Sequence, residues 1–178
     1  MNHPTDRTMF QNAFVVDDLD TAIAKWVDEL GIGPFFVADY EGVLTEIKYR
    51  GEPSELSMKV ALAQAGPVQI ELIQPTSSAP CAYRDGVPAG SGSAFHHMCA
   101  WTHDIEADTR YFEERGYPCA NIGYAGSAYF AYYDTRPLMG CMIEVVEKKP
   151  GVVELFGKIA QAAEGWDGSK PVRSVADL

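Results

Sequence analysis

The sequence carries one pattern twice, and this internal repeat restricts the possible folds more than any other feature. In each copy an apolar strand precedes an amphipathic helix, and three more strands follow. A shift of 86 residues superposes three pairs: Leu19 on Ile105, Asp20 on Glu106 and Trp26 on Phe112. One copy is too small to bury its own sheet, so we expect the two copies to pair in a single domain over residues 1–178.

The spacing of apolar residues places the elements of both copies. The first helix should begin after Asp18 and end at Gly31, because a left-handed C-cap favours a residue without a Cβ atom, and the second should begin at Asp104. Strands are predicted over 9–16, 35–40, 44–49, 57–63 and 68–74, and again over 94–102, 118–124, 127–134 and 139–146. Residues 76–93 are predicted as a connecting loop, 150–163 as a C-terminal helix and 165–178 as a polar tail. The predicted fold class is therefore α+β, with two βαβββ modules at about 8–75 and 94–147.

Four polar side chains occupy repeat-equivalent positions in these strands. Gln11 corresponds to His97 at the shift of 86, and Glu71 corresponds to Glu144 at a shift of 73, which leaves 13 extra residues in the first module. Each Glu interrupts an apolar run, and a buried carboxylate must be neutralised, paired or bound to a cation. Two Glu, one His and one Gln offer oxygen and nitrogen ligands whose charge cancels that of Zn²⁺, Ni²⁺, Co²⁺, Mn²⁺ or Mg²⁺. The alternative is that each Glu faces solvent on a half-exposed strand and that His97 is a core histidine.

Thiol and aromatic side chains near these positions are candidates for the wall of a substrate pocket. Because side chains alternate across a strand, Cys99 and Trp101 share the face of His97, and His96 should lie on the opposite face. The strand over 127–134 adds three further candidates: Tyr129, Tyr132 and Tyr133. The alternative for all of them is core packing, in which Cys99 is an inert buried thiol and the aromatic side chains pack against the core.

Composition and charge exclude several classes of function. The net charge is −11, whereas a nucleic-acid-binding surface is basic. No apolar run approaches the roughly 18 residues of a membrane span, and residues 1–7 lack the apolar core of a signal peptide. The four cysteines form no CxxC pair, which is typical of free thiols in a reducing compartment. We therefore expect a cytoplasmic protein that acts on a small molecule, with no nucleic-acid or membrane partner.

The segments that carry these residues resemble the vicinal oxygen chelate superfamily, which includes glyoxalase I, methylmalonyl-CoA epimerase, extradiol dioxygenases and bleomycin-resistance proteins. The resemblance spans about 9–147 and rests on four segments in order: 11–20, 70–75, 96–106 and 140–147. It implies that the sheets of the two modules curve into one mixed-sheet funnel. It also implies one divalent metal ion held by Gln11, Glu71, His97 and Glu144. Relatives commonly dimerise, so a homodimer is expected as well.

The resemblance further implies a chemistry. The leading hypothesis is an isomerase or lyase that removes a proton next to a carbonyl group through a metal-stabilised enolate, with Glu144 as the catalytic base. The substrate would be an acyl thioester, as for the epimerases, or a hemithioacetal, as for the glyoxalases; Glu46 is a guess for a second acid or base. The alternative is a non-catalytic drug-binding protein of the resistance type. An extradiol dioxygenase is disfavoured, because its iron site needs two histidines and only His97 stands at a ligand position.

Overall fold

The computed structural model describes residues 5–178, with side chains from residue 8 onward. Its strands are β1 (Thr5–Val15), β2 (Phe35–Asp39), β3 (Leu44–Tyr49), β4 (Glu52–Pro53), β5 (Met58–Ala65), β6 (Val68–Pro75), β7 (Ala94–Thr102), β8 (Cys119–Ala125), β9 (Ala128–Tyr133), β10 (Met142–Glu147) and β11 (Val172–Ser174). Its helices are α1 (Leu19–Leu30), α2 (Ala82–Gly86), α3 (Ile105–Glu113), α4 (Arg136–Met139), α5 (Pro150–Ala163) and the 3-10 helix η1 (Val175–Asp177). The opening residues, whose sequence we read as unlike a signal peptide, lie outside the described part at 1–4.

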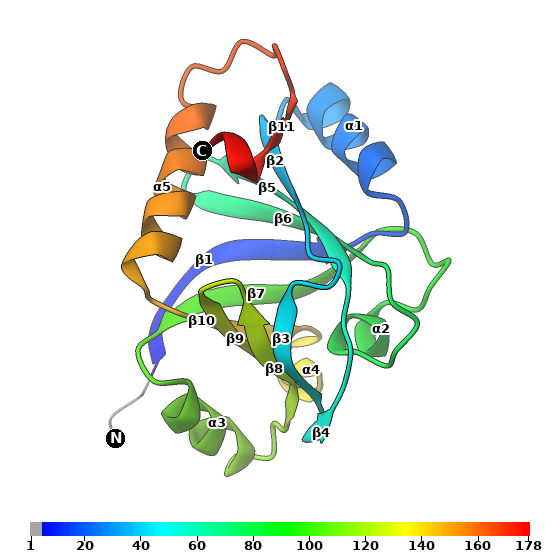
Figure 1. Ribbon diagram of the computed structural model, residues 1–178, viewed down its shortest axis with the longest axis vertical. Helices are drawn as coiled ribbons and strands as arrows, with labels where there is room; N and C mark the ends of the chain where they lie inside the picture. Colours follow the sequence, from blue (N-terminus) through cyan, green and yellow to red (C-terminus); the bar gives the residue numbers. More distant parts are fainter. Residues whose placement is uncertain (1–4) are drawn as a thin grey trace.

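The strands form one curved, mixed sheet in the order β11-β2-β5-β6-β1-β7-β10-β9-β8-β3-β4 (Figure 1). Each predicted module contributes four neighbouring strands, β2-β5-β6-β1 from the first and β7-β10-β9-β8 from the second. The first strands of the modules, β1 and β7, pair antiparallel at the centre. The last strand of each module, β6 or β10, lies parallel to the first strand of that module. The α+β fold with two βαβββ modules is thus confirmed.

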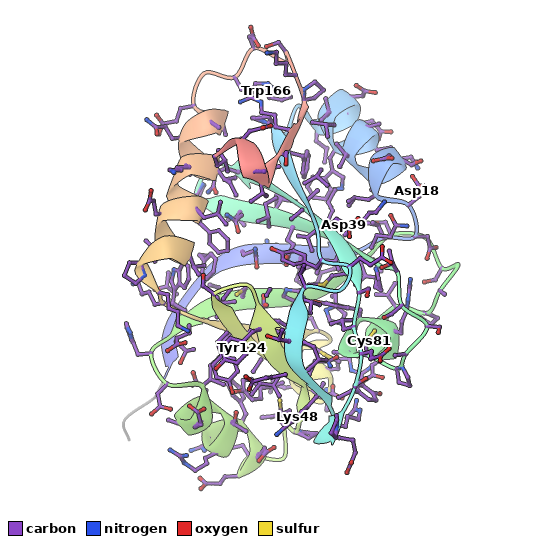
Figure 2. The ribbon with its side chains drawn as sticks, in the orientation of Figure 1. Asp18, Asp39, Lys48, Cys81, Tyr124 and Trp166 are labelled. Carbon is purple, nitrogen blue, oxygen red and sulfur yellow. The ribbon has the colours of Figure 1, made fainter. Side chains whose placement is uncertain are left out.

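Helices α1 and α3 begin at the residues that the sequence predicts. The Asp18 carboxylate accepts a hydrogen bond from the Thr21 amide at 2.7 Å, and the Asp104 carboxylate accepts one from the Ala107 amide at 2.8 Å. Asp18 is labelled at the start of α1 in Figure 2. Gly31 ends α1 with a φ of 64°, the left-handed conformation that favours glycine. Helix α1 packs against β5 and β6, and α3 packs against β8, β9 and β10.

The extra length of the first module lies mainly in a hairpin, β3–β4, inserted between β2 and β5. Strand β3 leaves its own module and pairs antiparallel with β8 of the second module, with Leu44 opposite Ala125. In this pairing, a Cβ atom on Gly123 would overlap Ile47 Cδ1 and lie 3.2 Å from Ile47 Cα. Glycine at position 123 therefore permits the close approach that extends the sheet beyond β8.

The linker and the tail contain structure that the sequence patterns did not predict. Helix α2 lies inside the expected loop over 76–93. Helix α4 ends at Met139, where the strand over 139–146 was predicted to begin, and β10 begins only at Met142. Both helices are too short for a helical period to be recognised in the sequence. The tail forms β11, which pairs parallel with β2, and then η1. Trp166, at the start of this tail, lies beside Gly33 (Figure 2).

The sheet is buried on both faces near its centre. On one face Ile70 and Leu72 of β6 pack with α1, and Ile143 and Val145 of β10 pack with α3. The other face forms the interior between the two modules, and α5 covers part of it against β5 (Figure 1). Strands buried on both faces read as continuous apolar runs, which is why a Glu within β6 or β10 is conspicuous. Within residues 5–178, no helix combines the length and the apolar character required to span a bilayer.

Candidate metal centre

Four neighbouring strands in the middle of the sheet carry the four predicted ligands, in the order Glu71 on β6, Gln11 on β1, His97 on β7 and Glu144 on β10. The register brings them to one level of the sheet. Ala13 of β1 pairs with both Glu71 and His97. Cys99 of β7 pairs with both Gln11 and Glu144. Residues two apart on a strand share a face, so all four side chains reach the interior between the modules.

Three of the four ligand groups meet at one point. Glu71, His97 and Glu144 each offer one ligand atom, and these atoms lie within 4.8 Å of one another. His97 Nε2 is 3.1 Å from Glu144 Oε2 and 3.4 Å from Glu71 Oε2. The His97 side chain is fully buried, whereas the Glu144 and Glu71 side chains are 7% and 13% exposed.

Gln11 borders the same cavity as the two carboxylates, and a second glutamine orients it. Gln11 Nε2 donates a hydrogen bond to Gln69 Oε1 at 2.7 Å. This bond leaves the carbonyl oxygen of Gln11 as its group for binding a cation. Gln69 is buried and stands two residues before Glu71, so it shares the face of Glu71. We did not single out Gln69 from the sequence, although strand alternation could have found it.

Burial and the neighbouring charges change the proton affinities of this cluster. Burial lowers the pKa of His97, but the carboxylates of Glu144 and Glu71 outweigh burial and raise it to about 9. Burial raises the pKa of Glu71, and the Glu144 carboxylate adds to this effect. The folded cluster therefore retains a proton at neutral pH in the absence of a cation. A divalent ion would replace that proton and neutralise both carboxylates.

The residues present fit a divalent metal ion. Among the described residues, Glu71 Oε2 and His97 Nε2 are buried without a hydrogen-bond partner. The two atoms lie 3.4 Å apart, so in the metal-free protein the proton of His97 is the only charge in this contact that offsets the burial of the two carboxylates. Both are ligand atoms, and two carboxylates, an imidazole and an amide oxygen form a donor set for Zn²⁺, Ni²⁺, Co²⁺, Mn²⁺ or Mg²⁺.

Strand β7 departs from regular alternation at His96. The register of β7 against β1 shifts by one residue between Phe95 and His97, which leaves His96 in a bulge. The expectation that His96 lies on the opposite face was wrong, because the bulge turns its ring toward His97. The two Nδ1 atoms are 2.9 Å apart, and His96 Nε2 is 2.9 Å from the Ala82 carbonyl oxygen. Burial and the neighbouring His97 lower the pKa of His96 to about 3, so this ring is neutral.

A cavity of about 130 Å³ adjoins the metal centre. Glu71, Glu144 and Gln11 form one side of it, and Tyr40 and Ser127 add polar groups elsewhere. The rest of the wall is mainly apolar and comes from β5, β9, β10, α5 and η1: Met58, Val60, Leu62, Phe130, Val146, Val152, Leu155, Phe156 and Val175. No Lys or Arg is among the described residues that line the cavity. The cavity therefore suits an uncharged, largely apolar group.

The three tyrosines predicted as pocket walls lie on two different faces of β9. Tyr132 lines the cavity. Tyr133 instead stacks on Phe112 of α3, with ring centroids 4.3 Å apart, and Tyr129 stacks on Tyr124 at 4.3 Å on the side of α3 (Figure 2). Consecutive residues of a strand point to opposite faces, so Tyr132 and Tyr133 cannot both line one cavity. The structure places Tyr133 in the core beside α3 and packs the half-buried Tyr129 against that core.

Cys99 and Trp101 lie behind the wall of the cavity. Cys99 is fully buried, and burial together with the Glu144 carboxylate raises the pKa of its thiol well above the usual value. Trp101 stacks on Phe10 with ring centroids 4.4 Å apart and approaches Phe156 at 5.6 Å. The indole thus supports a wall residue of α5 without bordering the cavity itself.

Glu46, the guess for a second acid or base, lies away from the cavity. It is exposed on β3, which joins the far edge of the sheet beside β8. Its electrostatic neighbour there is Tyr129, one of the tyrosines on the α3 side. The sequence alone does not show which strand of the first module is the inserted one, so it could not show that β3 leaves that module.

Comparisons with solved structures find other proteins whose fold is similar to that of this chain. Among solved structures, the chain is similar to a hypothetical protein from Bacillus halodurans C-125, with a TM-score of 0.53 and 20% identity over 80% of this chain and 94% of that chain. It is also similar to methylmalonyl-CoA epimerase from Mycobacterium tuberculosis, with a TM-score of 0.47 and 19% identity over 82% of this chain and 90% of that chain. None of the curated proteins compared with the chain matches it.

A family comparison of the sequence is more specific than these structural similarities. The model of the Glyoxalase/Bleomycin resistance protein/Dioxygenase superfamily matches residues 10–132, which is more than half of the chain. The matched span includes Gln11, Glu71 and His97 and ends before Glu144. The order of the strands, with two modules paired through their first strands, agrees with this match. The chain therefore belongs to the Glyoxalase/Bleomycin resistance protein/Dioxygenase superfamily.

Proposed function

We propose that this protein is a metal-dependent isomerase or lyase that transfers a proton at a carbon next to a carbonyl group. The observation that carries the proposal is the convergence of Glu71, His97 and Glu144 on one buried point at the side of an apolar cavity. Gln11 completes a ligand set whose two negative charges match a divalent ion. Superfamily membership supports this chemistry, because glyoxalases are among the members that give the family its name.

The cofactor and the chain have separate tasks in this proposal. A divalent ion, when bound, supplies Lewis-acid stabilisation of the negative charge that develops on a substrate carbonyl oxygen. Gln11, Glu71 and His97 hold the ion. The Glu144 carboxylate, at the cavity wall, accepts the proton from the substrate carbon. The apolar side chains around it exclude water, which strengthens the electrostatic interactions inside the cavity.

One base serves both proton transfers in our proposal. Apart from Glu71 and Glu144, the described residues that line the cavity include no carboxylate, imidazole or amine. We therefore assign both the removal and the return of the proton to Glu144. This arrangement favours a transfer between two adjacent carbons, as in a hemithioacetal, over an epimerisation that needs acids on both faces of the substrate.

The experiment is proton exchange in deuterated water, measured with protein loaded with each of the five candidate metals in turn. The substrates are hemithioacetals and 2-methyl or 2-hydroxy acyl thioesters. We expect metal-loaded protein to exchange the proton next to the carbonyl group. The exchange should be faster in the hemithioacetals than in the acyl thioesters. Glu144→Gln should reduce the rate by about 10²–10⁴-fold, because it removes a positioned base. Glu147→Gln is the matched control, since Glu147 lies on the same strand and pairs with Lys149 outside the cavity.

Two outcomes would contradict this proposal. If metal-loaded protein exchanges the proton in neither class of compound, the chain is not a proton-transfer enzyme of this type. If Glu144→Gln exchanges at the rate of the unchanged protein, another group is the base. Loss of activity in Glu147→Gln as well would show that the effect is not specific to the cavity.

The apolar wall of the cavity favours one second function, non-catalytic binding of an apolar small molecule. Eleven apolar side chains and the Tyr132 ring surround a space without positive charge. Such a protein would bind an aromatic ligand tightly in the presence of a chelator and show no turnover. Calorimetric titration of chelated protein with aromatic compounds distinguishes the two functions, because the enzyme proposal requires the metal.

A further inference from the structure

The hydrogen bonds of His96 determine which nitrogen of His97 can bind a metal. The carbonyl oxygen of Ala82 can only accept, so His96 Nε2, 2.9 Å away, must carry the proton that it donates. In a neutral ring Nδ1 is then unprotonated and accepts. Its partner is His97 Nδ1 at 2.9 Å, so His97 Nδ1 carries a proton. In the metal-free protein the second proton of the ring is therefore on His97 Nε2, 3.1 Å from Glu144 Oε2 and 3.4 Å from Glu71 Oε2, and the Nε2 lone pair becomes available when a cation displaces that proton.

We infer that His96 is a positioning residue of the metal centre, which holds His97 in the tautomer whose Nε2 lone pair points at the cation. A metal-binding histidine commonly donates its other ring N–H to an acceptor, and this acceptor fixes both tautomer and ring orientation. Here the acceptor is a second histidine, placed there by the bulge in β7. His96 does not touch the cavity, so it acts only through His97.

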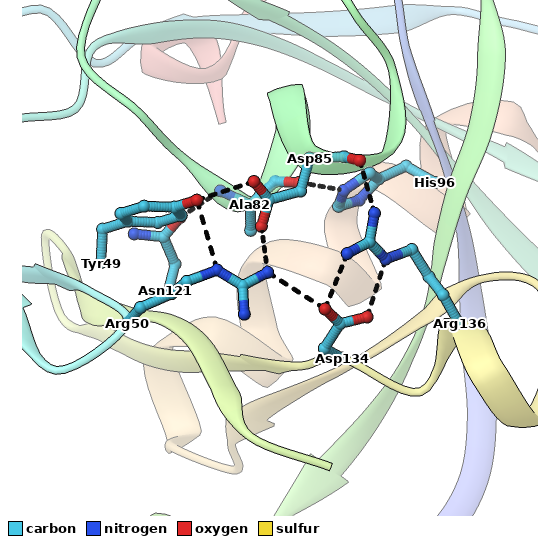
Figure 3. A network of polar contacts seen from close by, with 8 residues as sticks. All are labelled: Tyr49, Arg50, Ala82, Asp85, His96, Asn121, Asp134 and Arg136. Atoms are coloured by element: carbon cyan, nitrogen blue, oxygen red, sulfur yellow. Dashed lines mark hydrogen bonds and ion pairs between the residues drawn. The ribbon is translucent and has the colours of Figure 1, made fainter.

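The Ala82 carbonyl, which accepts the hydrogen bond from His96, belongs to helix α2, and hydrogen bonds from several segments fix this helix in place. The Ala82 amide donates to Asn121 Oδ1 at 2.6 Å (Figure 3). Asn121 Nδ2 in turn donates to the Lys48 carbonyl at 2.9 Å. Both ends of α2 are thereby anchored, because the Asp85 side chain at its other end is bound by Tyr49 at 2.7 Å.

Two arginines tie the same short helix to the end of β9. Arg50 donates to Asp85 Oδ2 at 2.5 Å and to Asp134 Oδ2 at 3.0 Å (Figure 3). The Arg136 guanidinium donates two hydrogen bonds of 2.7 Å to the Asp134 carboxylate and another to the Asp85 carbonyl oxygen. The network therefore joins the β3–β4 hairpin, the linker and the second module around the carbonyl that orients His96.

Zinc affinity and histidine tautomers test the inference, and neither readout depends on turnover. His96→Leu removes the acceptor and should weaken Zn²⁺ binding by about 10–100-fold. His96→Asn keeps an acceptor oxygen near the position of Nδ1 and should restore most of the loss. His103→Leu is the matched control, because His103 is exposed beyond the end of β7, and it should bind Zn²⁺ like the unchanged protein.

A spectroscopic measurement on the unchanged protein keeps the test independent of how the variants fold. In Zn²⁺-loaded protein labelled with ¹⁵N-histidine, we expect a proton on His97 Nδ1 and on His96 Nε2. A proton on His96 Nδ1, or metal bound through His97 Nδ1, overturns the inference. So does a folded His96→Leu protein with unchanged Zn²⁺ affinity. Failure of the unchanged protein to bind Zn²⁺ or any other divalent ion would overturn the metal centre of the proposed function and this inference with it.

Discussion

The buried cluster of Glu71, His97 and Glu144 couples the stability of the metal-free protein to pH. The pKa of His97 rises from 6.5 to about 9 in the folded protein, so the folded state binds this proton more tightly than the unfolded state. The resulting stabilisation is complete below about pH 6.5 and is lost as the pH rises through about 9. The pKa of Glu71 is also raised, which changes stability in the same direction. A bound cation removes this dependence, because it displaces the proton.

We predict that chelated protein loses stability between about pH 6.5 and about pH 9. The double substitution His97→Gln and Glu71→Gln should flatten this part of the profile, because it removes both groups whose pKa is raised. Urea unfolding at a series of pH values measures the effect, with His103→Gln as the control for an exposed histidine. A profile in the unchanged protein that is flat, or that rises over this range, would contradict the assigned protonation of His97.

The residues of the site show how far pattern reasoning reaches. Gln11, Glu71, His97 and Glu144 were proposed as ligands because strand alternation and the repeat both single them out, and the structure brings the last three within 4.8 Å. His96 escaped this reasoning because a bulge breaks the period of two at that residue. A bulge depends on the pairing between β1 and β7, which the local sequence does not contain.

At the scale of a single element, strand β3 shows that an inserted strand can be predicted from the sequence while its pairing partner cannot. Its range, Leu44–Tyr49, agrees with the strand predicted from the sequence. Its partner could not be predicted, because the same apolar alternation suits pairing with β2, β5 or β8. The close contact of Gly123 with Ile47 is one feature that makes the pairing with β8 possible.

We predict that Gly123→Ala destabilises the fold by about 1–3 kcal/mol, because the added methyl group overlaps Ile47 and approaches the Thr45 carbonyl at 3.1 Å. Gly157→Ala is the matched control. Gly157 lies within α5 with no atom within 4 Å of an added Cβ, so this change should stabilise by about 0.5–1 kcal/mol. Denaturant unfolding measures both changes. Equal effects of the two substitutions would show that β3 and β8 do not approach each other closely.

At the scale of the whole molecule, the C-terminal tail returns to the first module and borders the cavity. The tail adds β11 to the β2 edge of the sheet, where the Phe35 amide donates to the Pro171 carbonyl at 2.8 Å. Val175 of η1 then completes the cavity wall next to α5. The metal ligands lie on the central strands, whereas the tail lies at the β2 edge of the sheet (Figure 1). Closure of the cavity and construction of the metal centre therefore depend on different parts of the chain.

We predict that removal of residues 169–178 lowers the unfolding temperature but changes Zn²⁺ affinity by less than about tenfold, or 1.4 kcal/mol. The tail covers apolar surface of β2 and α5 and contributes no ligand. Thermal unfolding and zinc titration measure the two effects. Lys158→Met is the control, because it leaves the tail in place and removes only two exposed contacts of Lys158, the hydrogen bond to the Leu178 carbonyl and the ion pair with Glu154. A loss of Zn²⁺ affinity well beyond tenfold would mean that the tail supports the metal centre.

The sequence by itself determined the two modules, their helix ends and the four polar side chains directed at one interior. These features follow from periods of 2 and 3.6 residues and from capping residues, which are properties of neighbouring residues, and from the repeat, which is found by comparing the sequence with itself. Only the tertiary structure decided the partner of β3, the bulge that turns His96 toward His97, and the face of β9 that borders the cavity. Each of these depends on how distant strands pair, because register and close packing are set by both partners together.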